Sequence, residues 1–116
     1  MTKKKEDAVL ASAVLKLDVR ERLQIGNLMP ERGNYFEMIV GKHVQKKFEL
    51  SSKEVEAIEL KNTQTGITWN PDKEKPKNIE LTRTEIDFLK TQINRLSEEN
   101  QLPFSMLGLC EKIMDI

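Results

Sequence analysis

Two side chains of kinds that catalysis commonly uses occur once each in this sequence. His43 is the single histidine and Cys110 the single cysteine among 116 residues. His43 has no acidic, cysteine or second histidine residue at metal-ligand spacing, and its neighbours Lys42, Lys46 and Lys47 repel a bound cation. Cys110 lies on the apolar side of the expected last helix, where burial disfavours the reactive thiolate. We therefore expect an exposed histidine, a buried cysteine, no metal, no cofactor and no enzymatic activity.

Acidic residues are numerous, but they form no catalytic grouping in the sequence. Glu54, Glu56 and Glu59 fall on a face of an expected helix that is exposed, and Glu98 and Glu99 do the same later in the chain. General acid–base catalysis requires a carboxylate whose pKa is shifted inside a cleft. No glycine-rich or aromatic-lined segment surrounds these residues. We therefore expect solvated charges and no small-molecule substrate.

The composition is that of one water-soluble domain. The chain has 38% apolar and 33% charged residues, and its 19 basic side chains balance its 19 acidic ones. No global field therefore attracts nucleic acid or an acidic membrane surface. The chain has no run of about eighteen apolar residues, no apolar signal core near its start and no cysteine pair. We expect a cytoplasmic protein, neither secreted nor membrane-bound, with a frayed charged tail at residues 1–7 and one globular domain at 8–116.

Helix-start signals and apolar spacing predict three helices in the first half of the chain. The first is capped at Asp18 and ends before Pro30. The second covers residues 36–48, where apolar residues recur at helical spacing, and a short third helix begins with a capping box at Ser51. Residues 8–17 precede these helices and favour an extended or mixed segment.

The second half combines a strand region with two further helices. Residues 67–70 and 77–81 alternate between apolar and polar side chains, which predicts a short antiparallel ribbon. A capping box at Thr82 begins a long helix, Asn100 is a suitable left-handed terminator, and Pro103 can begin the last helix. The sequence thus predicts a mostly helical α+β fold with three N-terminal helices, a β-ribbon and a C-terminal helical hairpin.

Three short segments carry a resemblance to a known group of proteins. They are NLMPERG at residues 27–33, GITWNP at 66–71, and LCEKI at 109–113 after the long capped helix. With this order, roughly residues 17–114 resemble small uncharacterised proteins encoded by bacteriophages and prophages. The resemblance implies a bacterial host as the setting, and it carries over no catalytic or binding residues.

By elimination, we expect an accessory protein that acts by protein–protein interaction. The last helix places apolar residues over about half of its circumference, and the narrow seam of the preceding helix cannot cover that arc. Either the first half of the chain covers the rest, or one edge stays open to a second copy or another protein. The candidate partner-binding residues are Leu107, Leu109, Ile113, Met114 and Ile116.

A second function remains open, because three helices followed by a two-stranded ribbon is also the order of a winged helix. Its nucleic-acid contacts would be Lys42, Lys46, Lys47 and Lys53. The expected third helix, however, carries Lys53 together with three glutamates, and this charge balance opposes binding to phosphates. A winged-helix-like nucleic-acid-binding regulator is therefore the alternative, and protein binding is the preferred function.

Overall fold

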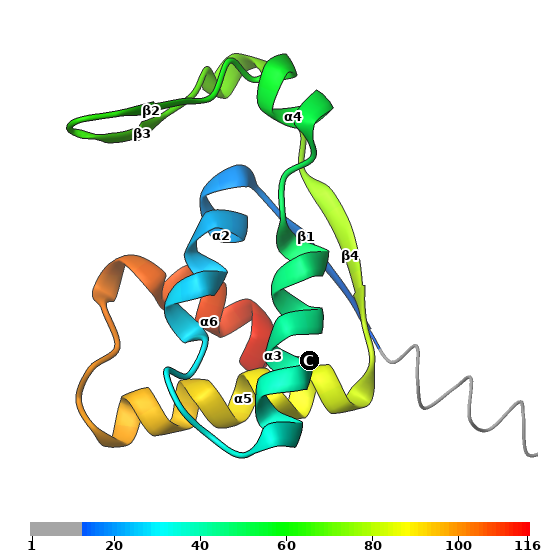
Figure 1. Ribbon diagram of the computed structural model, residues 1–116, viewed down its shortest axis with the longest axis vertical. Helices are drawn as coiled ribbons and strands as arrows, with labels where there is room; N and C mark the ends of the chain where they lie inside the picture. The colour runs from blue at the N-terminus through cyan, green and yellow to red at the C-terminus, as the bar shows by residue number, and fades with distance from the viewer. Residues whose placement is uncertain (1–12) are drawn as a thin grey trace, which may run out of the picture.

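The computed structural model describes residues 13–116, so the expected tail at residues 1–7 and the segment 8–12 lie outside the described residues. The described chain is a mostly helical α+β fold with two small antiparallel sheets (Figure 1). In chain order, the elements are β1 (Ala13–Leu17), α2 (Val19–Gln24), η1 (Ile25–Leu28), α3 (Tyr35–Phe48), α4 (Ser52–Ala57), β2 (Lys61–Thr63), β3 (Gly66–Thr68), η2 (Pro71–Lys73), β4 (Lys77–Leu81), α5 (Arg83–Glu98), η3 (Phe104–Met106) and α6 (Leu107–Met114).

The strand pairing differs from the expected ribbon. β4 pairs antiparallel with β1, and the segment expected to pair with β4 forms β3 instead, which pairs with β2. The extended interpretation of residues 13–17 is confirmed, because Leu15 and Leu17 alternate with exposed residues and lie on the same core face as Ile79 and Leu81. Because β1 and β4 each bury only one face, the two strands can share one core, whereas every residue of β2 and β3 is exposed.

Four helices begin with a capping box, in which one glutamate accepts a hydrogen bond from the N-cap backbone N–H. Each of these glutamates also forms an ion pair with a basic residue far away in the sequence. The pairs are Glu21 with Lys112, Glu37 with Arg95, Glu54 with Arg22 and Glu85 with Lys47, at N–O distances between 2.5 and 2.9 Å. One carboxylate therefore fixes the start of a helix and also joins that helix to another element.

The expected C-terminal helical hairpin is confirmed in α5 and α6. Asn100 ends α5 with a φ of 57°, and the next amide, that of Gln101, donates to the Leu96 carbonyl at 2.8 Å, as in a left-handed helix cap. The α-helical part of the last segment begins at Leu107 and not at Pro103, because a 3-10 turn intervenes. Both helices contribute fully buried side chains, such as Leu89 and Ile113, to the common core.

The segment from α4 to η2 projects from the helical body as an arm (Figure 1). Its tip is the β2–β3 hairpin, and residues 61–68 are all exposed. The body consists of α2, α3, α5, α6 and the β1–β4 ladder, with α3 packed on α5. No helix within residues 13–116 is both long and apolar enough to cross a membrane.

Candidate protein-binding groove

The structure divides the expected partner-binding residues of the last helix into two groups. Leu109 and Ile113 are buried in the core, so their assignment to a partner surface was wrong. The last helix, α6, packs on α5 and also on β1. The sequence did not predict that β1 lies beside this helix. Leu107, Met114 and Ile116 remain between 39% and 45% exposed, so an apolar edge does stay open.

The basic residues of the nucleic-acid alternative are unequally available. Lys42 and Lys46 are exposed on α3, and Lys53 is exposed on α4, which is only 6 residues long. Lys47 is partly buried, and its Nζ donates to the Glu80 carbonyl at 2.9 Å and to Glu85 Oε1 at 2.6 Å. Because Lys47 is neutralised within the fold, it is a poor candidate for binding phosphate.

The two residues with potential catalytic chemistry lie in unlike surroundings. His43 is exposed on α3, as the sequence predicts. Cys110 is buried, also as predicted, and burial raises the pKa of its thiol. No three His, Cys, Asp or Glu side chains within residues 13–116 are grouped so that they could hold a metal ion.

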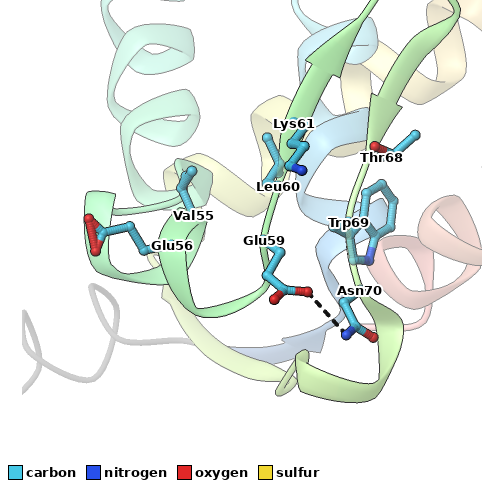
Figure 2. Close-up of a pocket in the computed structure, with 8 residues that line it drawn as sticks. All are labelled: Val55, Glu56, Glu59, Leu60, Lys61, Thr68, Trp69 and Asn70. Carbon is cyan, nitrogen blue, oxygen red and sulfur yellow. Dashed lines mark hydrogen bonds between the residues drawn. The ribbon is translucent and has the colours of Figure 1, made fainter.

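A hollow of about 560 Å³ lies at the base of the arm (Figure 2). Glu59 there has a left-handed φ of 57°, and its carboxylate accepts from Asn70 Nδ2 at 3.2 Å and from Lys73 Nζ at 3.3 Å. The Asn70 hydrogen bond, together with Lys73, lowers the pKa of Glu59. Trp69 Nε1 donates to Glu74 Oε1 at 2.9 Å, and Glu74 Oε2 accepts from the α2 backbone. The Glu59 contacts join residues within the arm, and Glu74 ties the arm to α2, so we assign the hollow a structural role.

A second hollow, the α3–α5 groove, has different properties. It has a volume of about 350 Å³. Its apolar walls are Phe36 and Val40 from α3 and Phe88 from α5. The Phe88 ring lies against Gly41, where an added Cβ would be 3.2 Å from the ring, so this glycine lets the two helices approach closely. The remaining lining residues are Glu37, Thr84, Asp87, Thr91 and Gln92.

Large apolar side chains lie exposed at the start of α3, and one of them, Phe36, lines this groove. Tyr35 is 82% exposed, Phe36 is 65% exposed and Met38 is 40% exposed. The sequence placed Phe36 on the apolar face of a helix, but the structure leaves it mostly in solvent. A signal was present, since two adjacent aromatic residues follow a helix cap in a chain that has only 6 aromatic residues.

Gln92, one of the lining residues, has a buried hydrogen-bond donor without a partner. The residue is only 4% exposed, and within residues 13–116 its Nε2 is the one buried side-chain nitrogen or oxygen without a partner. A buried polar atom without a hydrogen bond costs about 1–3 kcal/mol. A donor that the fold itself does not satisfy thus lies beneath the wall of the groove.

Charges around the groove are paired. Glu37 forms an ion pair with Arg95 at 2.9 Å, and Asp87 lies 3.8 Å from Arg83 on the next turn of the same helix. Each of the two acidic residues that line the groove thus has a basic partner outside it. The apolar walls of the groove suit an inserted apolar side chain.

Comparison of the chain with protein-family models, with curated proteins and with solved structures finds no match in any of the three. The geometry and chemistry of the α3–α5 groove are therefore the basis on which a function can be assigned.

Proposed function

We propose that this is a non-enzymatic accessory protein of bacteriophage or prophage type, which acts in the cytoplasm of a bacterial host by binding a protein chain. The binding surface is the α3–α5 groove together with the first turn of α3, which carries Tyr35, Phe36 and Met38. The observation that carries the proposal is the exposure of these three residues, of which Phe36 forms a wall of the apolar groove.

Physical chemistry supports a protein partner at this surface. Tyrosine, phenylalanine and methionine are enriched at protein interfaces, where they dominate the binding energy. Complete burial of a side chain such as Phe36 contributes about 1.5–3 kcal/mol. A few anchors of this kind suffice for a specific complex once the unfavourable entropy of association is subtracted.

The α3–α5 groove replaces the last helix as the preferred surface. Leu107, Met114 and Ile116 offer exposed apolar area, but they line none of the hollows described above. A partner gains more from a groove than from a convex edge, because a concave site covers more of each inserted side chain. We keep the edge of α6 as a comparison surface for the experiments.

Nucleic-acid binding is the second candidate function, and the projecting hairpin is the observation that favours it. In a winged helix such a hairpin contacts the nucleic-acid backbone. Here the hairpin residues 61–68 contain a single charged side chain, Lys61. Titration of random duplex DNA at several salt concentrations tests this function, and we expect no salt-dependent binding.

Site-specific crosslinking in bacterial cells tests the proposal. A photoactivated benzophenone amino acid replaces Met38, an exposed residue on the first turn of α3, and in a matched chain it replaces the exposed Gln64 at the hairpin tip. We expect a discrete covalent adduct with a protein, either a second copy or a different chain, only from position 38. Adducts from position 64 alone would make the arm the interface, and the absence of any adduct from position 38 would disprove the proposal.

A further inference from the structure

We infer that a second surface of this protein, a hollow where the arm joins the helical body, binds an acidic segment of a partner protein and takes one apolar side chain from it. The hollow has a volume of about 280 Å³. It is lined by residues of α2, of α4 with the loop before it, and of the segment 73–77 that returns to β4. We call it the lysine-rimmed hollow. It shares no lining residue with the α3–α5 groove, so the two surfaces are separate.

The bottom of the lysine-rimmed hollow is apolar. Val19 and Ile58 are only 2% and 4% exposed, and the more open Leu50 and Ala57 lie with them in its wall. Sites that enclose a whole small molecule usually have about 300–1,000 Å³. This hollow, at about 280 Å³, is smaller than that range. It therefore suits one apolar side chain of a longer chain better than a complete small molecule.

Three lysines also line this hollow, and two of them are unpaired. Lys75 and Lys77 are exposed, and neither forms an ion pair with another residue of the described range 13–116. Lys73 pairs with Glu59 at 3.3 Å, although both of these side chains are about half exposed. Two cations are thus available to carboxylates on an incoming chain.

The carboxylates close to this rim are already engaged. Glu54, which also lines the hollow, forms a two-oxygen ion pair with Arg22. Glu74 accepts from Trp69 Nε1 at 2.9 Å and from the first backbone N–H of α2 at 2.8 Å. These contacts hold the walls in place before a partner arrives, which reduces the entropy lost on binding. They also leave the two unpaired lysines as the charges to be matched, so charge complementarity selects an acidic chain.

An acidic protein segment fits this hollow better than a nucleic acid, which is also negatively charged. Nucleic-acid binding depends on cations that neutralise many phosphates. Only Lys75 and Lys77 are free for that purpose here, within the described part of the chain. The apolar bottom of the hollow gains from an aliphatic side chain, which a nucleic acid does not have.

Titration of the nitrogen-15-labelled full chain with short synthetic peptides, followed by amide correlation spectra, tests the inference. One peptide is acidic with a central leucine, a second is acidic with serine at that place, and a third is basic with the leucine. We expect the acidic leucine peptide to shift the amides of Leu50, Ala57 and Lys77 saturably, with a dissociation constant on the order of 1 mM. Serine should weaken binding by about 10-fold or more, and the basic peptide should not bind.

Variants of the rim lysines test the role of charge. Lys75→Gln combined with Lys77→Gln is expected to weaken binding of the acidic leucine peptide by about 2- to 30-fold. Added salt should weaken binding to the wild type more than to this variant, because salt screens exposed charges. Lys42→Gln combined with Lys46→Gln is the matched control, since it removes two exposed cations that do not line the hollow. The control should bind like the wild type, and the spectra themselves report whether each variant is folded.

Four results would overturn the inference. The first is the absence of a saturable shift with the acidic leucine peptide. The second is equal binding of the basic peptide, or an equal loss in the control variant, because the rim lysines would then select nothing. The third is a shift confined to the α3–α5 groove or to the exposed edge of α6, which would place the peptide elsewhere. The fourth is a short single-stranded DNA that shifts the amides of the hollow more strongly than the peptide, which would assign the hollow to nucleic acid.

Discussion

Removing the charge of Glu54 is expected to destabilise the protein at neutral pH and to have little effect in strong acid. Glu54 forms a two-oxygen ion pair with Arg22, which is only 3% exposed. The same guanidinium donates to the carbonyls of Phe48 at 3.2 Å and Glu49 at 2.6 Å. This one cation thus joins α2, the end of α3 and the start of α4, and Glu54 supplies the negative charge that it needs.

The magnitude follows from the pKa of Glu54. The hydrogen bond from Arg22 is the largest cause that lowers this pKa, from 4.5 to about 2, and the Ser51 backbone N–H contributes further while burial opposes both. A change of one in pKa corresponds to about 1.4 kcal/mol, so the full shift would represent about 3 kcal/mol. The Glu54 side chain is 30% exposed, and solvent screening reduces the expected contribution to about 1–2 kcal/mol.

The direction of the pH dependence follows from the same values. The folded-state pKa of Glu54, about 2, lies below the value of 4.5 expected in the unfolded chain. Proton binding therefore favours the unfolded state in this range. The stabilisation by Glu54 is complete above about pH 5 and is lost as the pH falls towards 2.

Urea unfolding of the wild type and of Glu54→Gln, at about pH 7 and about pH 2.5, measures this contribution. Glutamine preserves the capping box, because its side-chain oxygen can still accept from the Ser51 N–H. We expect a loss of about 1–2 kcal/mol at pH 7 that nearly disappears at the lower pH. Glu56→Gln, at an exposed position on the same helix, is the control, and its free energy of unfolding should equal that of the wild type at both pH values.

Two results would refute this reasoning. An equal loss at both pH values would show that Glu54 acts through packing or the cap and not through its charge. No loss at pH 7 would show that the ion pair contributes nothing to stability. Arg22→Met gives an independent measure, since it leaves a carboxylate and two carbonyls without their donor, and we expect a loss of about 3–5 kcal/mol.

Three further predictions concern single residues. Gln92→Leu removes a buried unsatisfied donor and is expected to raise the free energy of unfolding of the monomer by about 1 kcal/mol or more; an unchanged urea midpoint would contradict this. Asn100→Ala is expected to lower the free energy of unfolding by about 1 kcal/mol, because alanine is strained at a φ of 57°. Asn100→Gly should change the free energy of unfolding by only a few tenths of a kcal/mol in the same assay. Burial raises the pKa of the Cys110 thiol, so iodoacetamide should modify Cys110 much more slowly in the native protein than in urea, and equal rates would mean that the thiol is accessible.

The helix boundaries could be predicted because their signals are local. Ser51 and Thr82 each accept from the backbone N–H of a glutamate three residues later, as their sequence spacing implied. The cap at Asn34 was missed, although Glu37 completes the same pattern. The β1–β4 ladder could not be predicted in the same way, since its partners are 60 to 68 residues apart and either strand shows only which of its faces is apolar.

The candidate site was less predictable than the fold. Apolar spacing shows which residues share a helical face, but it does not show which end of that face another element covers. Phe36 and Val40 lie one turn apart on α3, yet Val40 is buried and Phe36 is exposed. Gln92 could have been noticed, because it is a polar residue on the same buried stripe of α5 as Phe88 and Leu89, beyond the capping glutamate Glu85.

The α3–α5 groove differs from the rest of the described chain because some of its groups lack partners. Elsewhere, the capping glutamates have both a local and a distant partner, and the polar groups at the base of the arm are paired. At the α3–α5 groove the buried side-chain amide of Gln92 lacks an acceptor, and the ring of Phe36, at the start of α3, is mostly exposed. The buried amide costs the monomer about 1–3 kcal/mol. The exposed ring leaves unused the apolar burial of about 1.5–3 kcal/mol that a partner at the proposed interface would provide.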